Sequence, residues 1–177
     1  RPSKLALITP LDELGGGANA QTGHEFTRYF AWAPAEGFEV ALETVFEMVA
    51  RAIITEENVA LERGAIEQEY RDRYTSGNGL LETYLFQKYF GTHALGHLPL
   101  GTPGSIRAMT KETLAYFRKR YYHPRSLHVV CGGSFAAKCA LPSVGRVFGA
   151  MDGKLEPWQT IETAPAPLSH SCLEKIT

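Results

Sequence analysis

The sequence predicts an α+β fold, in which a mostly antiparallel sheet carries helices packed on one face as a two-layer sandwich. Several segments repeat apolar residues at helical spacing, and residues 18–33 alternate like the two strands of a hairpin. Helices and strands do not follow one another as regular βαβ units. With 177 residues and 44% hydrophobic content, the chain can bury one core, so we expect residues 1–177 to form a single domain.

The composition is that of an ordinary globular protein and excludes several classes. The net charge is −1 and the pI is about 6.7, so no basic excess points to a nucleic-acid partner. No apolar run approaches the length needed to cross a bilayer, so we expect no membrane span. Cys131, Cys139 and Cys172 are widely spaced and form no CxxC pair, which argues against a disulfide framework.

The N-terminal part predicts a helix followed by a hairpin. Residues 4–14 are predicted as a short helix that ends at Gly15, because glycine is a common helix stop. Residues 18–24 and 25–33 are predicted as the two strands, and Pro34 ends the second.

The middle of the chain is predicted to be helical. Residues 38–53 carry apolar residues on one side and glutamates on the other, and we interpret the apolar side as core. Thr55 is the expected N-cap of a second helix that runs to about Tyr74. Residues 80–90 are predicted to be helical again.

Histidines are frequent in the second half but do not form a metal motif. His93 and His97 are four apart, a spacing that could hold zinc on a helix, but the surrounding glycines and prolines predict a loop over residues 91–105. The remaining four are scattered and are expected at surface or hairpin positions: His24, His123, His128 and His170.

The C-terminal third predicts a helix, a strand and a second helix. Thr110 is the expected N-cap of a helix to about residue 122. Residues 127–131 are apolar apart from His128, and such a run is typical of a buried strand. Residues 136–151 are expected to be helical in spite of an internal proline. Local composition predicts a surface connection over residues 152–168. It also predicts the start of another strand at residues 171–177.

Two carboxylates of the second helix, Glu62 and Glu69, carry the strongest chemical signal. They are seven residues apart, so they lie within roughly 20° of each other on one face of a helix. Apolar residues flank that line on both sides: Val59, Ile66 and Tyr70 on one, Leu61 and Ala65 on the other. We therefore expect both acids to face protein, where an unpaired carboxylate is costly. The pair then requires a cation, which can be a metal ion, an arginine or a lysine.

Several stretches together resemble one family, the pitrilysin/insulinase group of zinc peptidases, which includes the mitochondrial processing peptidase. Residues 16–22, Gly-Gly-Ala-Asn-Ala-Gln-Thr, followed by Thr27 and Tyr29, resemble the hairpin motif of that family. Glu62-Arg63-Gly64 with Glu69 resembles its second acidic motif. Residues 101–132 resemble its later helix and strand through Gly-Thr, Ser-Ile, Tyr-Phe, Tyr-Tyr-x-Pro and Val-Val-Cys-Gly.

The resemblance implies a role for each of these residues. Glu69 would be the third ligand of a catalytic Zn²⁺, and Glu62 would be the neighbouring acid that orients the site. Asn19, Ala20 and Gln21 would form the strand that pairs with the backbone of a peptide or unfolded protein substrate. The family works with two such halves around a chamber, so the resemblance also implies a second homologous domain or subunit.

The sequence departs from the family in one respect. The family signature, His-x-x-Glu-His, supplies two zinc ligands and the general base, and it is absent from residues 1–177. We therefore expect residues 1–177 to be an incomplete peptidase-like domain, without the segment before Arg1 or its C-terminal end, and inactive alone. The leading hypothesis is a domain of a zinc-dependent endopeptidase. A non-catalytic partner subunit of the same fold and an unrelated α+β binding module with a salt-bridged acid pair are the alternatives.

Overall fold

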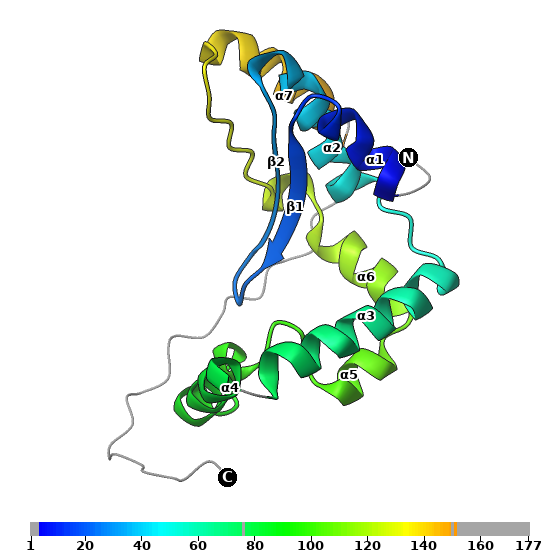
Figure 1. Ribbon diagram of the computed structural model, residues 1–177, viewed down its shortest axis with the longest axis vertical. Coiled ribbons are helices and arrows are strands. Elements are labelled where there is room, and N and C mark those ends of the chain that lie inside the picture. Colours follow the sequence, from blue (N-terminus) through cyan, green and yellow to red (C-terminus); the bar gives the residue numbers. More distant parts are fainter. Residues whose placement is uncertain (1–3, 76, 150, 152–177) are drawn as a thin grey trace. The chain divides into compact units, whose positions relative to one another are not determined.

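The computed structural model describes residues 4–75, 77–149 and 151, which divide into two compact units (Figure 1). The first unit contains residues 4–59 together with the described residues from 109 onward, and the second contains residues 60–108. The described part is mainly helical and has one small antiparallel sheet, which is consistent with the α+β class. The expectations for residues 152–168 and 171–177 lie outside the described residues.

The first unit begins with helix α1, Lys4–Asp12, which is two residues shorter than predicted and is followed by a turn that contains Gly15. The N–H of Gly16 donates to the carbonyl of Leu11 at 2.8 Å, and the N–H of Gly15 donates to the carbonyl of Asp12 at 2.9 Å. This pair of bonds is the Schellman arrangement, and it requires a left-handed residue at its turn. Gly15 adopts φ of 72°, a conformation that glycine reaches without steric cost.

The predicted hairpin is present as strands β1, Gly17–Thr22, and β2, Thr27–Trp32. The strands pair antiparallel, with Gly17 opposite Trp32 and Ala20 opposite Tyr29. A Cβ atom at position 17 would lie 2.5 Å from the Trp32 ring, so the indole covers the start of β1 only because residue 17 is glycine. Helix α2 packs against both strands of this hairpin.

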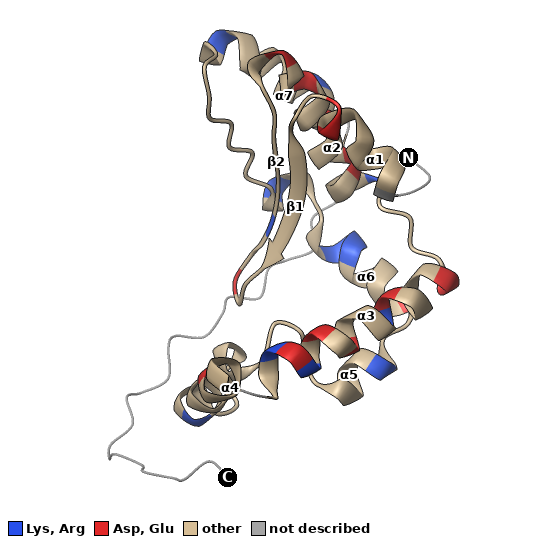
Figure 2. Cartoon of the chain, viewed as in Figure 1, with Lys and Arg blue, Asp and Glu red and all other residues tan. Residues whose placement is uncertain are grey.

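The core of the first unit lies between α2, Phe38–Ala50, and α7, Ala137–Phe148. Leu42 and Phe46 of α2 and Val147 of α7 are buried against one another, and the Phe46 ring meets the Phe148 ring edge-on at 5.4 Å. The apolar side of α2 is therefore core, as predicted. At the rim, the acidic residues of α2 face a basic residue of α7 (Figure 2), since Arg146 lies 2.5 Å from Glu39.

Helix α6, Lys111–Tyr121, completes the helices of the first unit. The Thr110 side chain accepts a hydrogen bond from the N–H of Thr113 at 3.2 Å, which confirms the predicted N-cap. The Arg118 guanidinium donates to the carbonyls of Ala50 and Ala52, so α6 is hydrogen-bonded to the end of α2.

The strand predicted at residues 127–131 is wrong for the described structure. Those residues follow the short 3₁₀ turn η3, Pro124–Ser126, and form no ladder with any described strand. Val130 is 91% exposed, so the segment is not buried either. An apolar run becomes a strand only when it has a pairing partner, and the described hairpin strands pair with each other alone.

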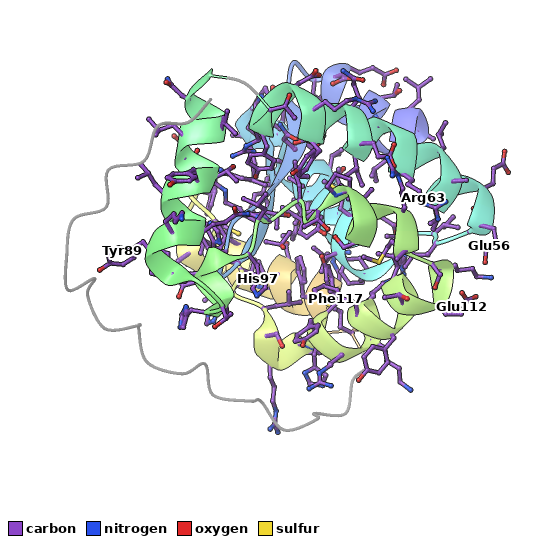
Figure 3. The ribbon with its side chains drawn as sticks, turned by 90° about the horizontal axis from the view of Figure 1, so that it is seen from below. Glu56, Arg63, Tyr89, His97, Glu112 and Phe117 are labelled. Carbon is purple, nitrogen blue, oxygen red and sulfur yellow. The ribbon has the colours of Figure 1, made fainter. Side chains whose placement is uncertain are left out.

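The second unit is built from helices. Helix α3, Glu56–Tyr74, begins in the first unit and contributes most of its length here, followed by α4, Gly77–Phe90, and α5, Pro103–Ala108. The N–H of Asn58 donates to Oγ1 of Thr55 at 3.1 Å, as the predicted N-cap requires. Glu56, in the first turn of α3, projects outward (Figure 3), where a carboxylate interacts favourably with the helix dipole. None of the helices in the described residues has the length and apolarity needed to cross a bilayer.

We predict that Phe46→Ala lowers the free energy of unfolding by about 3–5 kcal/mol, because it leaves a cavity between α2 and α7. Leu141→Ala is the matched control on α7, since that side chain is 68% exposed, and it should cost less than about 1 kcal/mol. Urea unfolding followed by circular dichroism measures both values. Equal losses in the two variants would contradict this account of the core.

Candidate functional site

The outer edge of β1 is the candidate site of the first unit. Among the described residues, β1 pairs only with β2, so its other edge has no strand partner. The N–H of Gly23 donates to the carbonyl of Phe26 at 2.9 Å next to the turn. Because hydrogen-bonded and non-bonded pairs alternate along an antiparallel ladder, Ala20 and Tyr29 form a non-bonded pair. The backbone N–H and C=O of Ala20 therefore point to the free edge.

The three residues predicted to bind substrate lie together on this strand, and all three are exposed. The side-chain oxygen of Asn19 accepts a hydrogen bond from the N–H of Ala20 at 2.8 Å, as expected for an amide that faces away from β2. The Gln21 side chain accepts a hydrogen bond from Arg28 at 2.5 Å. Chemically, this edge can form main-chain hydrogen bonds with an extended peptide.

Behind this edge, the Tyr29 hydroxyl lies 2.6 Å from the Tyr122 hydroxyl. Both side chains are half-buried, and the two rings meet edge-on with centroids 6.1 Å apart. Burial raises the pKa of Tyr29, the hydrogen bond to Tyr122 raises it further, and the charge of Arg118 lowers it by less than these two effects. Tyr29 is therefore neutral at physiological pH.

A separate candidate site, in the second unit, is the acidic side of α3, where the burial prediction is wrong. Glu62 and Glu69 are both exposed. The side of α3 that is buried or half-buried carries Val59, Arg63, Ile66, Glu67, Tyr70 and Tyr74. The two acids lie roughly 90° around the helix from the centre of that side.

The apolar residues expected on the far side of the two acids do not pack. Leu61 is 73% exposed and Ala65 is exposed, so the apolar arc ends at the acids instead of enclosing them. Within the described residues, neither Glu62 nor Glu69 forms an ion pair or hydrogen bond with a basic side chain. The carboxylate of this helix that does pair is Glu67, which lies 2.8 Å from Arg107 of α5.

The histidines do not complete a metal site in the described residues. His93 and His97 flank the 3₁₀ turn η2, Ala94–Gly96, as the loop prediction expected, and Nδ1 of His93 accepts a hydrogen bond from the N–H of Leu95. The surface assignment of His123 is wrong, because it is 5% exposed. Its Nδ1 accepts a hydrogen bond from the N–H of Arg125 at 3.1 Å, so the imidazole caps the start of the turn η3.

The donor set of the described residues does not match what a zinc site requires. A catalytic zinc takes three protein ligands, and no three His, Cys, Asp or Glu side chains in residues 4–75, 77–149 and 151 are grouped to hold a metal ion. The described residues therefore do not form a zinc site by themselves. Glu69 offers one exposed carboxylate.

Comparison with known proteins identifies the family. The family model described as insulinase, peptidase family M16, matches residues 1–103. The chain belongs to the insulinase family. An uncharacterised zinc protease of Streptomyces coelicolor is 31% identical over 132 residues, which cover 75% of this chain and 29% of that protein. The chain spans about a third of the length of the curated relatives it matches.

Solved structures share the fold. A protease from Helicobacter pylori matches with a TM-score of 0.77 at 23% identity, covering 89% of this chain and 38% of that one. An inactive M16 peptidase domain from Pseudomonas fluorescens matches with a TM-score of 0.75 at 18% identity, covering 92% of this chain and 40% of that one. The fold thus occurs both in a protease and in a domain described as inactive.

Two contacts were not predicted from the sequence. Spacing gives no signal for the pair of Tyr29 and Tyr122, which are 93 residues apart, although each belongs to a stretch that resembles the family. The ion pair of Glu67 with Arg107 has no local signal for the same reason, since the two are 40 residues apart.

We predict that Tyr29 makes part of the stability dependent on pH in the alkaline range. Because folding raises the pKa of Tyr29, its contribution is fully present below the ordinary tyrosine pKa of about 10 and is lost as the pH rises beyond it. The difference in melting temperature between the wild type and Tyr29→Phe should therefore shrink above about pH 10. Thermal unfolding of both proteins across that range measures the difference, and a constant difference would show that Tyr29 does not titrate as described.

Proposed function

We propose that this chain is a domain of a zinc-dependent endopeptidase that cleaves peptides or unfolded protein segments. The observation that carries the proposal is the free edge of β1, where the backbone groups of Ala20 point away from β2 in a chain of the insulinase family. An extended peptide adds to such an edge through main-chain hydrogen bonds, which are the same for every sequence. Asn19, Ala20 and Gln21 are the residues we assign to substrate binding.

Glu69 is the zinc ligand that we assign to this domain, and Glu62 is the acid that supports it. The exposure of both side chains and the absence of basic partners among the described residues leave the carboxylates available to a metal site completed by donors outside those residues. Zinc proteases among the relatives make Zn²⁺ the metal to test.

The two-layer sandwich and the second homologous domain or subunit also belong to this proposal. The described sheet has two strands, and a hairpin of that size is marginally stable alone. Additional strands paired with β2, with α2 and α7 covering one face, would give a sheet wide enough for a two-layer fold and leave the edge of β1 free. We also propose that the two compact units act as parts of one domain.

The alternative is a non-catalytic partner subunit of the same fold, which binds substrate or a catalytic mate. The structural similarity to the inactive domain from Pseudomonas fluorescens supports this alternative. A free strand edge serves either role, so metal content and activity separate the two. The other hypothesis, an unrelated binding module, is excluded by the family match.

We predict that Glu69→Gln in the intact protein lowers zinc affinity and peptidase activity by more than about 100-fold, because it removes a metal ligand, whereas Glu62→Gln costs about 10- to 100-fold. Glu57→Gln is the control, since Glu57 is an exposed acid in the first turn of the same helix. Metal analysis and hydrolysis of labelled casein measure the effects. Unchanged zinc content in Glu69→Gln would remove Glu69 from the metal site, and an intact protein without zinc or activity would favour the non-catalytic partner.

We predict that Ala20→Pro weakens peptide binding by at least about fivefold, because it removes the N–H that faces the free edge. Proline is tolerated at an edge position whose N–H does not enter the ladder, so the melting temperature should change little. Thr22→Ala, which alters only an exposed side chain of the same strand outside the three assigned residues, is the control. Fluorescence anisotropy with labelled casein measures binding, and normal binding by Ala20→Pro would exclude this edge as the substrate site.

A further inference from the structure

We infer that the hydrogen bond between Tyr29 and Tyr122 is a positioning contact, which fixes the centre of the substrate strand. Tyr29 pairs directly with Ala20, the middle one of the three residues assigned to substrate binding. Its hydroxyl lies 2.6 Å from the hydroxyl of Tyr122, which is the C-cap residue of α6. The inference rests on the proposed function of β1, and it adds residues that do not touch the substrate.

The aromatic packing of the hairpin lies at its base, while its tip is exposed. At the base, the Trp32 ring covers Gly17, and the Phe30 and Trp32 rings are 6.0 Å apart. At the tip, Thr22 and Thr27 are exposed and Phe26 is 61% exposed. The register places Tyr29 between base and tip, so its hydroxyl holds the hairpin at the level where the substrate would pair.

Tyr122 is a fixed partner because α6 is itself held in place. Its N–H donates to the carbonyl of Arg118 at 2.9 Å, which places Tyr122 at the helix end. Arg118 in turn donates to the carbonyls of Ala50, the last residue of α2, and of Ala52, which follows it. Helix α2 packs against β2, so hairpin, α2 and α6 form a closed set of contacts in the first unit.

The pairing geometry explains how a contact behind the strand affects its edge. Residues directly opposite in an antiparallel pair carry side chains on the same face, so the Ala20 methyl and the Tyr29 ring share one face. Movement of Tyr29 away from α6 would rotate Ala20 with it and misalign the outward N–H and C=O. Loss of the hydroxyl contact should therefore weaken substrate binding without removing any group that binds substrate.

The experiment uses Tyr29→Phe, Tyr122→Phe and the double variant of the intact protein. Tyr116→Phe is the matched control, because it removes a hydroxyl from the same α6, where the bond is to Arg120 of that helix. Binding of fluorescein-labelled β-casein is measured by anisotropy with EDTA present to stop cleavage. Melting temperature and hydrogen exchange of residues 17–32 are measured in parallel.

Each single variant should bind β-casein about fivefold more weakly and should show faster hydrogen exchange in the hairpin. Its melting temperature should be lower, because one half-buried hydroxyl loses its hydrogen-bond partner. The double variant leaves no such hydroxyl, so its melting temperature should recover while its binding stays weak. Tyr116→Phe should bind as the wild type does.

Wild-type binding by the double variant, or by both single variants, would overturn the inference while leaving the proposed function intact. A wild-type protein that fails to bind β-casein would overturn the proposed function, and the inference with it. Recovery of the melting temperature without recovery of binding is the result that a purely stabilising role cannot produce.

Discussion

The packing of α2 is the constraint on which the first unit depends. This helix contacts α1, both strands of the hairpin and α7, and its buried face contributes Leu42 and Phe46 to the core. The carbonyls at its C-terminal end also accept the hydrogen bonds from Arg118 of α6. Burial of apolar area is the largest favourable term in folding, so the position of β1 follows from how this one helix packs.

Local signals in the sequence predicted several helix ends, but they missed α5, whose first residues were predicted as a loop. Gly15 ends α1, and Thr55 and Thr110 begin α3 and α6, because caps and stops are satisfied by hydrogen bonds within a few residues. The hairpin was also predictable, since its strands are neighbours in the sequence and alternate visibly. Pro142 lies inside α7 as expected. It lacks the N–H of one helical hydrogen bond, and the packing of α7 against the core offsets the stability lost.

Features that depend on distant residues were predicted poorly. Residues 127–131 are apolar enough for a strand, but no local feature shows whether a pairing partner is present. The periodicity of α3 located Glu62 and Glu69 on one line, but it could not show which flank of that line would pack. Family resemblance named these acids and the β1 residues together, whereas helix geometry alone left the cation open.

The hydrogen bond from the N–H of Ala20 to the Asn19 side chain affects which extended chains can pair with β1. An uncovered strand edge can recruit any other extended chain, including another copy of the same protein, and this promotes aggregation. Here the Asn19 carboxamide already occupies the outward amide of Ala20, so an arriving strand must exchange one bond for another. The enthalpy gained from this exchange is small. A strand that pairs only at Ala20 therefore binds weakly, and chains that form several main-chain hydrogen bonds along β1 are favoured.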